Sequence, residues 1–122
     1  MTKILIVDDE KDLREMVNLL LHKEGYETEM AENGSDFLEK LDIFNPDVVT
    51  LDIMMPGLTI TEIFEKLKEK ESNPKIILLT SIRYSNKEKE RLCQMWNVVD
   101  YIIKPFEVDD LLKRIHKQVT KV

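Results

Sequence analysis

Three short apolar runs in this chain end abruptly in charged residues, and this feature constrains the fold most. The runs cover residues 4–7, 48–51 and 101–103, and the charged residues that follow them are Asp8, Asp9, Asp52 and Lys104. Short runs rich in Val and Ile are typical of strands buried on both faces of a parallel sheet. If all three lie in one such sheet, their charges emerge together at its carboxyl edge, where open α/β sheets bind ligands.

Three carboxylates that meet at one edge repel each other unless a cation joins them. A hard divalent ion such as Mg2+ prefers an oxygen-rich site of this kind. A lysine beside the ion adds a second positive centre, which suits a phosphoryl group. Asp8, Asp9 and Asp52 are therefore candidate metal ligands, and Lys104 is a candidate anion-binding residue.

The rest of the chain alternates short strand-like runs with amphipathic segments. We expect strands at residues 3–8, 26–31, 47–52, 75–80 and 100–103, with a helix after each. Five strand–helix units with short links predict an α/β fold. The expected architecture is a doubly wound (βα)5 flavodoxin-like sandwich whose five-stranded parallel sheet has the order 2-1-3-4-5. Residues 1–122 are expected to form a single domain.

Local signals mark the ends of several predicted helices. Thr59 and Ser85 are each followed three residues later by a glutamate, which is the spacing of a capping box at a helix start. Gly25 follows the first amphipathic segment, at a place where glycine commonly ends a helix. Residues 26–31 alternate polar and apolar side chains, so we place this strand at an edge of the sheet.

Composition excludes several classes of protein. The net charge is -6 with both signs mixed along the chain, whereas direct nucleic-acid binding requires a basic face. No apolar run approaches the roughly 20 residues that span a membrane, and the N-terminus lacks the long apolar stretch of a secretory signal. The single cysteine, Cys93, excludes an internal disulfide and is expected to be a small packing residue. These features predict a cytoplasmic protein.

The acidic residues also have a plain structural interpretation. An acidic pair after a strand can cap the next helix, which stabilises the helix by about 1 kcal/mol. Asp52 at an equivalent edge weakens this interpretation for Asp8 and Asp9, because capping needs no carboxylate from another strand.

The ends of the last two predicted strands carry further candidates. Thr80 and Ser81 follow the fourth strand, where their hydroxyls can donate to an anion or cap the next helix. Lys104 directly precedes Pro105, and this proline can set the backbone so that the lysine points inward. A cis peptide bond at this place would be a deliberate feature.

Five sequence anchors occur in order at the predicted strand ends. They are Asp8-Asp9, Asp52, Met55-Pro56-Gly57, Thr80-Ser81 and residues 100–106, which read Asp-Tyr-Ile-Ile-Lys-Pro-Phe. Each anchor is weak alone, but the set is specific. Over its whole length the chain resembles the receiver domain of two-component response regulators, of the kind found in chemotaxis response regulators.

The resemblance implies a phosphorylation-controlled signalling switch rather than an enzyme with a turnover substrate. Asp52 would take a phosphoryl group from the phosphohistidine of a sensor histidine kinase, and the domain would assist its own phosphorylation and dephosphorylation. Mg2+ would be held by Asp8, Asp9, Asp52 and the backbone carbonyl of Met54, with Asp8 acting directly or through water. Lys104 would pair with the attached phosphoryl group.

The same resemblance implies how the signal leaves the site. Thr80 would donate its hydroxyl to the phosphoryl group and Tyr101 would fill the space this opens, so both are candidate switch residues. The output would be a changed surface on the fourth helix, fifth strand and fifth helix, including Trp96, Tyr101 and Phe106. A downstream effector protein or output domain would read this surface. Family members often pair through this surface on activation, so phosphorylation-dependent homodimerisation is open. It is also open whether the chain is a stand-alone domain or part of a longer protein.

The chain departs from the family pattern at two places, and two further positions bear on how long a phosphoryl group would stay attached. Residues 59–60 are Thr-Ile where the family usually has Asp-Gly, and the predicted capping box lets the third helix begin without them. Residues 97–98 are Asn-Val where the family often has Gly-Ala, so we expect Asn97 to be a left-handed cap of the fourth helix. Met54 and Ile82 are apolar where side chains of this family govern how water reaches the phosphoaspartate, which predicts slow self-dephosphorylation.

Two other functions compete with the phosphorylated switch. A receiver-like interaction module that no longer depends on phosphate would keep the fold, but all five anchors are intact. A Mg2+-dependent phosphohydrolase of the haloacid-dehalogenase kind would also use Asp52, but it needs a second aspartate two residues later, where Met54 stands. Flavin or dinucleotide binding lacks the Gly-rich loop after the first strand.

Overall fold

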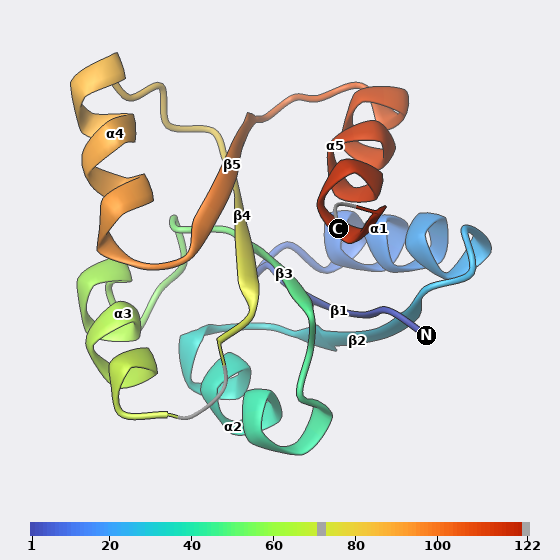
Figure 1. The fold of residues 1–122 in the computed structure, drawn as a ribbon, viewed down its shortest axis with the longest axis horizontal. Coiled ribbons are helices and arrows are strands. Elements are labelled where there is room, and N and C mark those ends of the chain that lie inside the picture. Colours follow the sequence, from blue (N-terminus) through green and yellow to red (C-terminus); the bar gives the residue numbers. More distant parts are fainter. Residues whose placement is uncertain (71–72, 121–122) are drawn as a thin grey trace.

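The computed structural model describes residues 1–70 and 73–120, which form a helix–sheet–helix sandwich (Figure 1). The elements in chain order are β1 (Lys3–Val7), α1 (Lys11–Lys23), β2 (Glu27–Ala31), α2 (Gly34–Phe44), β3 (Val48–Leu51), α3 (Ile60–Lys68), β4 (Lys75–Thr80), α4 (Asn86–Met95), β5 (Val98–Ile103) and α5 (Val108–Thr120). These strands form one sheet in the order β2-β1-β3-β4-β5, and every neighbouring pair is parallel. The predicted α/β class and strand order are confirmed.

Helices cover both faces of the sheet. α1 and α5 lie on one face, and α2, α3 and α4 lie on the other (Figure 1). Because successive side chains of a strand point to opposite faces, β1 directs Ile4 and Ile6 toward α1 and α5, and Leu5 and Val7 toward the other layer. This two-sided burial explains why β1 is a continuous apolar run rather than an alternating one.

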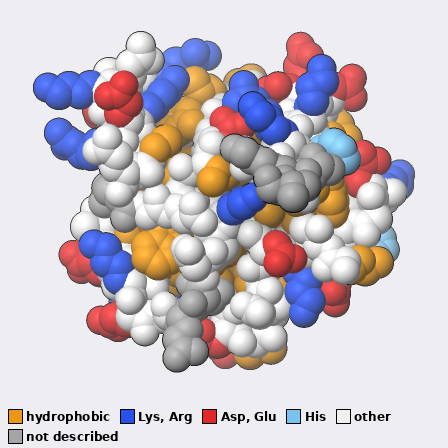
Figure 2. Space-filling model, in the orientation of Figure 1, with side chains coloured by type: hydrophobic (Ala, Val, Ile, Leu, Met, Phe, Trp, Pro, Cys, Tyr) orange, Lys and Arg blue, Asp and Glu red, His pale blue; other side chains and the backbone are white. Residues whose placement is uncertain are grey.

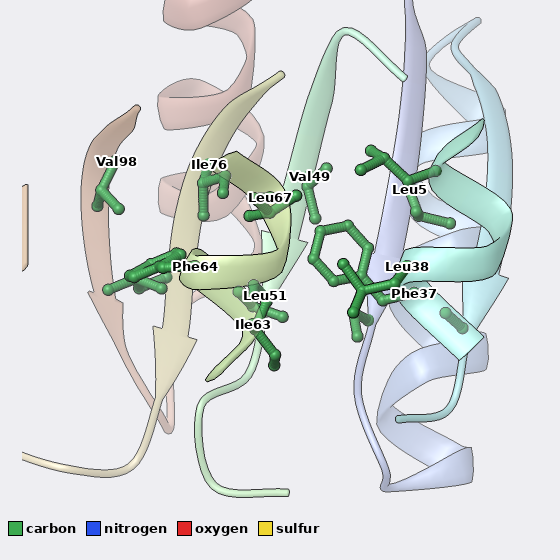
Figure 3. Packing of buried hydrophobic residues seen from close by; sticks show 14 of the residues in the cluster. Leu5, Phe37, Leu38, Val49, Leu51, Ile63, Phe64, Leu67, Ile76 and Val98 are labelled. Carbon is green, nitrogen blue, oxygen red and sulfur yellow. The ribbon is translucent and has the colours of Figure 1, made fainter. Parts of the chain in front are cut away.

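The larger apolar cluster lies between the sheet and the layer of α2, α3 and α4. Figure 3 shows Phe37 of α2 beside Leu5 and Val49 of the central strands, and Phe64 of α3 over β4 and β5. Phe37 and Phe64 are fully buried. Burying one such side chain contributes roughly 1.5–3 kcal/mol to the stability of the fold, so this layer stabilises the sheet. The carboxyl ends of the strands are therefore held in fixed positions.

Most helix ends follow the signals in the sequence. The side chains of Thr59 and Ser85 accept hydrogen bonds from the N–H groups of Glu62 and Glu88, both at 3.2 Å. The carboxylate of each glutamate in turn accepts a hydrogen bond from the N–H of the cap residue, so both capping boxes are confirmed. Gly25 has a φ of +94° directly after α1, as expected for a terminating glycine. β2 occupies the edge position predicted for it.

The junction between α4 and β5 differs from the prediction. The cap of α4 is Trp96 in an extended conformation, so the expectation that Asn97 is a left-handed cap is wrong. Asn97 instead donates its side-chain amide to the carbonyl of Pro74 at 3.4 Å. β5 begins at Val98, earlier than expected, because Val98 pairs with Ile76 of β4 and is buried in the cluster beneath α4.

The prediction that Cys93 is a small packing residue is also wrong. Cys93 is exposed on α4, whereas the preceding residue, Leu92, is buried. Neighbouring residues of a helix point in directions about 100° apart, so the burial of Leu92 does not bury Cys93 as well. Within the ranges that the structure describes, no helix is long and apolar enough to cross a membrane.

Candidate functional site

Two carboxylates lie where β1 ends. The N–H of Asp8 donates to the carbonyl of Ala31 at 3.1 Å, which continues the ladder one residue past the strand. Asp8 is 2% exposed, whereas Asp9 is exposed. Asp8 Oδ1 accepts a hydrogen bond from the N–H of Glu10 at 2.9 Å. The cap of α1 is Glu10, so the helix-capping interpretation of Asp8 and Asp9 is not supported.

Asp52 follows β3, which is the neighbour of β1 in the sheet. Its N–H donates to the carbonyl of Val7 at 3.0 Å, so the two strand ends are tied together where the carboxylates begin. Asp52 is 3% exposed, and its Oδ1 accepts a hydrogen bond from the N–H of Met54 at 2.9 Å. This bond fixes the carboxylate and leaves Oδ2 for other partners.

The predicted charged residues meet at one point. One ligand oxygen each from Asp8, Asp9 and Asp52 lies within 4.8 Å of the others. The Nζ of Lys104 lies 2.8 Å from Asp8 Oδ2 and 3.3 Å from Asp52 Oδ2. Lys104 follows β5, and its N–H donates to the carbonyl of Thr80 at 2.8 Å, which sets its position beside the end of β4.

Burial and charge together set the electrostatics of the site. Burial raises the pKa of Asp52, and the charge of Asp8 adds to this effect, although the Met54 N–H and Lys104 oppose it. Burial by itself lowers the pKa of Lys104, but its hydrogen bond to Asp8 and the charges of Asp52 and Asp8 outweigh that effect and raise the pKa. One ammonium group thus partly offsets three carboxylates.

The donor set fits a hard divalent cation. Mg2+ takes carboxylate oxygens together with several waters, and it is usually bound through only one or two protein carboxylates. Asp8 and Asp52 supply buried carboxylates, and the exposed position of Asp9 keeps the group open to solvent. The site can therefore hold such an ion without a closed cage of protein ligands.

The two predicted switch residues converge on Ile82, in the segment between β4 and α4. Thr80 is fully buried, and its Oγ1 accepts a hydrogen bond from the N–H of Ile82 at 3.2 Å. The hydroxyl of Tyr101 donates to the carbonyl of the same residue. The ring of Tyr101 packs edge-to-face on Tyr84 with centroids 5.8 Å apart, and Lys89 Nζ lies 5.1 Å from the Tyr101 ring centroid.

Other predicted residues lie at the rim of the site. Ser81 is exposed, and the side chain of Met54 is an exposed apolar group beside Asp52. The peptide bond between Lys104 and Pro105 is cis, which the sequence had allowed.

Sequence reasoning missed two residues near the site. Arg14 of α1 donates from Nη1 to the carbonyl of Asp8 at 2.7 Å. No sequence pattern marked this contact, because it depends on the direction of α1 and on the conformation of the Arg14 side chain. Tyr84, which packs on Tyr101, lies in an irregular segment where no periodic pattern marks it.

Fold and site together define a class of protein. It is a flavodoxin-like α/β domain that gathers three carboxylates, a lysine and a buried threonine at the carboxyl edge of its sheet. The chain belongs to the response regulator receiver domain family, whose sequence profile matches residues 4–116. The resemblance drawn from the sequence anchors is confirmed.

Relatives with similar sequences differ in how much of them this chain covers. The chain is 36% identical over 115 residues to the transcriptional regulatory protein ResD of Bacillus subtilis, which covers 93% of this chain and 46% of ResD. It is 32% identical over 115 residues to sporulation initiation phosphotransferase F of the same organism, covering 94% of this chain and 91% of that protein. The chain thus spans about half the length of ResD but most of the second relative.

Solved structures show the same architecture. The response regulator TrrA of Thermotoga maritima, solved in complex with Mg2+ and BeF, matches with a TM-score of 0.79 and 38% identity over 97% of this chain and 99% of that chain. TrrA has also been solved in complex with the histidine kinase ThkA, where the match has a TM-score of 0.79 and 36% identity over 98% of this chain and all of TrrA.

Proposed function

We propose that Asp52 accepts a phosphoryl group from the phosphohistidine of a sensor histidine kinase and that this event switches the surface of the domain. The observation that carries the proposal is the environment of Asp52. Its carboxylate is buried, is held by the N–H of Met54 at 2.9 Å, and is flanked by Asp8, Asp9 and Lys104. Family membership and the two TrrA complexes support the proposal.

The transfer forms one bond and breaks one. A carboxylate oxygen of Asp52 bonds to phosphorus, while the bond from phosphorus to the kinase histidine nitrogen breaks and its electron pair stays on nitrogen. Oδ1 of Asp52 is engaged by the N–H of Met54, so we assign Oδ2, which faces Lys104, as the nucleophile. Lys104 then exchanges its contact with Asp52 for the oxygens of the attached group.

The proposed cofactor is Mg2+, which when bound offsets negative charge on the transferring phosphoryl oxygens. We assign its ligands to Asp8, Asp9, Asp52 and the backbone carbonyl of Met54, with Asp8 acting directly or through water. The convergence of the three carboxylates within 4.8 Å supports this assignment.

The proposed switch residues are Thr80 and Tyr101. A phosphoryl group on Asp52 would draw the Thr80 hydroxyl away from the N–H of Ile82, its donor at 3.2 Å. Tyr101 holds the carbonyl of the same residue, so a movement of Ile82 reaches the Tyr101 side chain directly. Phosphorylation then biases an existing equilibrium between two arrangements.

The proposed output surface comprises α4, β5 and α5 and includes Trp96, Tyr101 and Phe106. A groove of about 600 Å³ lies on it, lined by residues of all three elements. Arg114 at this groove pairs with Asp100 at 2.8 Å and with Asp110 at 3.1 Å. We propose that a downstream effector protein or output domain binds here, and that a second phosphorylated copy can pair through the same surface.

The proposal treats residues 1–122 as one receiver domain. It acts as a phosphoacceptor that assists its own phosphorylation and dephosphorylation, without a turnover substrate. A cytoplasmic location suits the exposed thiol of Cys93, which a reducing compartment keeps free. Direct nucleic-acid binding is not part of the proposal, because acidic and basic side chains are interspersed on the face shown in Figure 2.

The test is the intact mass of the protein after incubation with acetyl phosphate, with and without Mg2+. We expect one Mg2+-dependent phosphoryl adduct in the wild type and none in Asp52→Ala. Asp109→Ala, which removes an exposed carboxylate of α5, is the matched control and should keep the adduct. Absence of an adduct under every condition would instead favour the phosphate-independent interaction module.

A further inference from the structure

We propose that Arg14 is a positioning residue of the metal site. It holds the peptide group that joins Asp8 to Asp9, and thereby keeps the two carboxylates in the arrangement that binds Mg2+. Arg14 lies on α1 and is not one of the assigned metal ligands or switch residues. The inference rests on the proposed function, because it concerns the ion that phosphoryl transfer requires.

The contact that carries this inference is a short, charge-assisted hydrogen bond. Nη1 of Arg14 donates to the carbonyl of Asp8 at 2.7 Å in a partly buried position. Hydrogen bonds with one ionised partner are roughly twice as strong as neutral ones. The strand β1 ends at Val7, so the carbonyl of Asp8 lies beyond its regular pairing and gains a fixed direction from Arg14.

Three hydrogen bonds hold different parts of Asp8 in the loop between β1 and α1. The N–H of Asp8 donates to Ala31, and the carboxylate of Asp8 accepts from Glu10, so these two bonds hold the start and the side chain of the residue. The bond from Arg14 holds the carbonyl, which sets the plane of the peptide leading to Asp9. Asp9 is exposed, so the direction of its carboxylate depends on that peptide plane.

Arg14 is itself well anchored. Its N–H donates to the carbonyl of Glu10 at 2.9 Å, in the first turn of α1. Among the described residues, the Glu10 side chain makes no capping hydrogen bond to α1. The Arg14 side chain therefore links the first turn of this helix to the loop that carries Asp8 and Asp9.

If Arg14 acted through its charge alone, its removal would have the opposite effect on Mg2+ binding. A guanidinium group near a cation site repels the ion, so if Arg14 acted only through its charge, removing it would strengthen Mg2+ binding. If Arg14 positions the carboxylates, removing it weakens binding. The direction of the change in Mg2+ affinity therefore separates the two roles.

The test is a titration with Mg2+ followed by backbone amide chemical shifts of the wild type, Arg14→Gln, Arg14→Lys and Arg91→Gln. Loss of a group that orients metal ligands typically weakens metal binding 10–100-fold, so we expect about tenfold weaker binding for Arg14→Gln. Arg14→Lys retains a donor and should recover part of the affinity. Arg91→Gln removes the same charge from an exposed position on α4 and should bind as the wild type does.

Arg14→Gln that binds Mg2+ as tightly as the wild type, or more tightly, would overturn the inference and leave the proposed function standing. Should Arg14→Gln fail to fold, Arg14→Lys decides: affinity a few-fold weaker than wild type supports the inference, and equal affinity overturns it. A wild type that binds no Mg2+ would overturn the proposed function and this inference together.

Discussion

Thr50 has a buried hydroxyl whose hydrogen-bonding capacity is unused. It is 1% exposed in β3, between Ile6 and Ile77 on the neighbouring strands, and its Oγ1 finds no partner among the described residues. Leaving such a group unpaired costs about 1–3 kcal/mol. We predict that Thr50→Val, which keeps the shape and removes the hydroxyl, raises the free energy of unfolding by about 1 kcal/mol. Urea unfolding with an unchanged m value would measure this.

The control for this prediction is Thr28→Val in the edge strand β2. Thr28 is only half-buried, so its hydroxyl reaches water and its replacement should change stability little. Unfolding of Thr50→Val at the same or a lower urea concentration than the wild type would contradict the prediction.

We predict that Met54 and Ile82 affect how long a phosphoryl group stays on Asp52. Met54 is 56% exposed beside Asp52, and neither apolar side chain can orient a water for attack. We predict slow loss of phosphate in the wild type and about tenfold faster loss in the double variant Met54→Asn with Ile82→Glu, a modest part of what a positioned base contributes. The decay of the phosphorylated mass after removal of the donor measures both rates.

Met16→Gln is the matched change for this experiment, because Met16 is a partly exposed apolar residue on α1. Its phosphoryl group should decay at the wild-type rate. A double variant that loses phosphate no faster than the wild type would refute the role given to these two positions.

Among the elements, α3 depends on the capping box that begins it. Thr59 accepts from Glu62 N–H at 3.2 Å, and Glu62 accepts from Thr59 N–H at 3.1 Å. We predict that Thr59→Ala lowers the free energy of unfolding by about 1 kcal/mol, because the N–H of Glu62 at the helix start loses the hydroxyl that accepts its hydrogen bond. Thermal or urea unfolding measures the loss. Thr61→Ala, an exposed change in the same first turn, should cost clearly less, and equal losses would contradict the account.

The strands and helices could largely be predicted because their signals are local. Buried runs, capping boxes and Gly25 each act through their own few residues. The cap of α4 could not be predicted, because Asn97 is drawn to Pro74 by the tertiary structure. The left-handed asparagine is instead Asn45, with a φ of 51° at the end of α2. Both asparagines follow a helix, but only Asn45 takes the left-handed conformation. The sequence near each helix end does not distinguish the two cases.

The site was predictable to the extent that strand ends determine it. Asp8, Asp9 and Asp52 follow the neighbouring strands β1 and β3, so the sheet order brings them together. Lys104 follows β5, two strands away from β3, and its long side chain reaches Asp8 and Asp52. The contact from Arg14 depends on the direction of a helix and on a side-chain conformation, which the strand pattern does not encode.

At the scale of the whole molecule, the ionised carboxylate of Asp52 opposes folding. Burial raises the pKa of Asp52, so the folded state binds its proton more tightly than the unfolded state does. Stability linked to Asp52 is therefore greatest below the unfolded pKa of about 3.9 and falls as pH rises through the folded value. We predict that Asp52→Asn is more stable than the wild type at neutral pH without Mg2+, by on the order of 1 kcal/mol.

The measurement is urea unfolding of both proteins in a chelator from pH 4 to pH 8. The advantage of Asp52→Asn should shrink as pH falls toward the unfolded pKa, because Asp52 is then protonated in the folded wild type and increasingly protonated in its unfolded state. An advantage that is constant across this range, or a less stable variant at neutral pH, would contradict the electrostatic account.

The central claim is that Asp52 itself receives the phosphoryl group. Borohydride reduces an aspartyl phosphate to homoserine, so peptide mass spectrometry after reduction identifies the residue that was modified. We predict homoserine at position 52 after incubation with a phosphoryl donor and Mg2+, and unmodified aspartate at positions 8 and 9. Homoserine at another position, or none at 52 in protein that carries the adduct, would contradict the assignment of Asp52 as the acceptor.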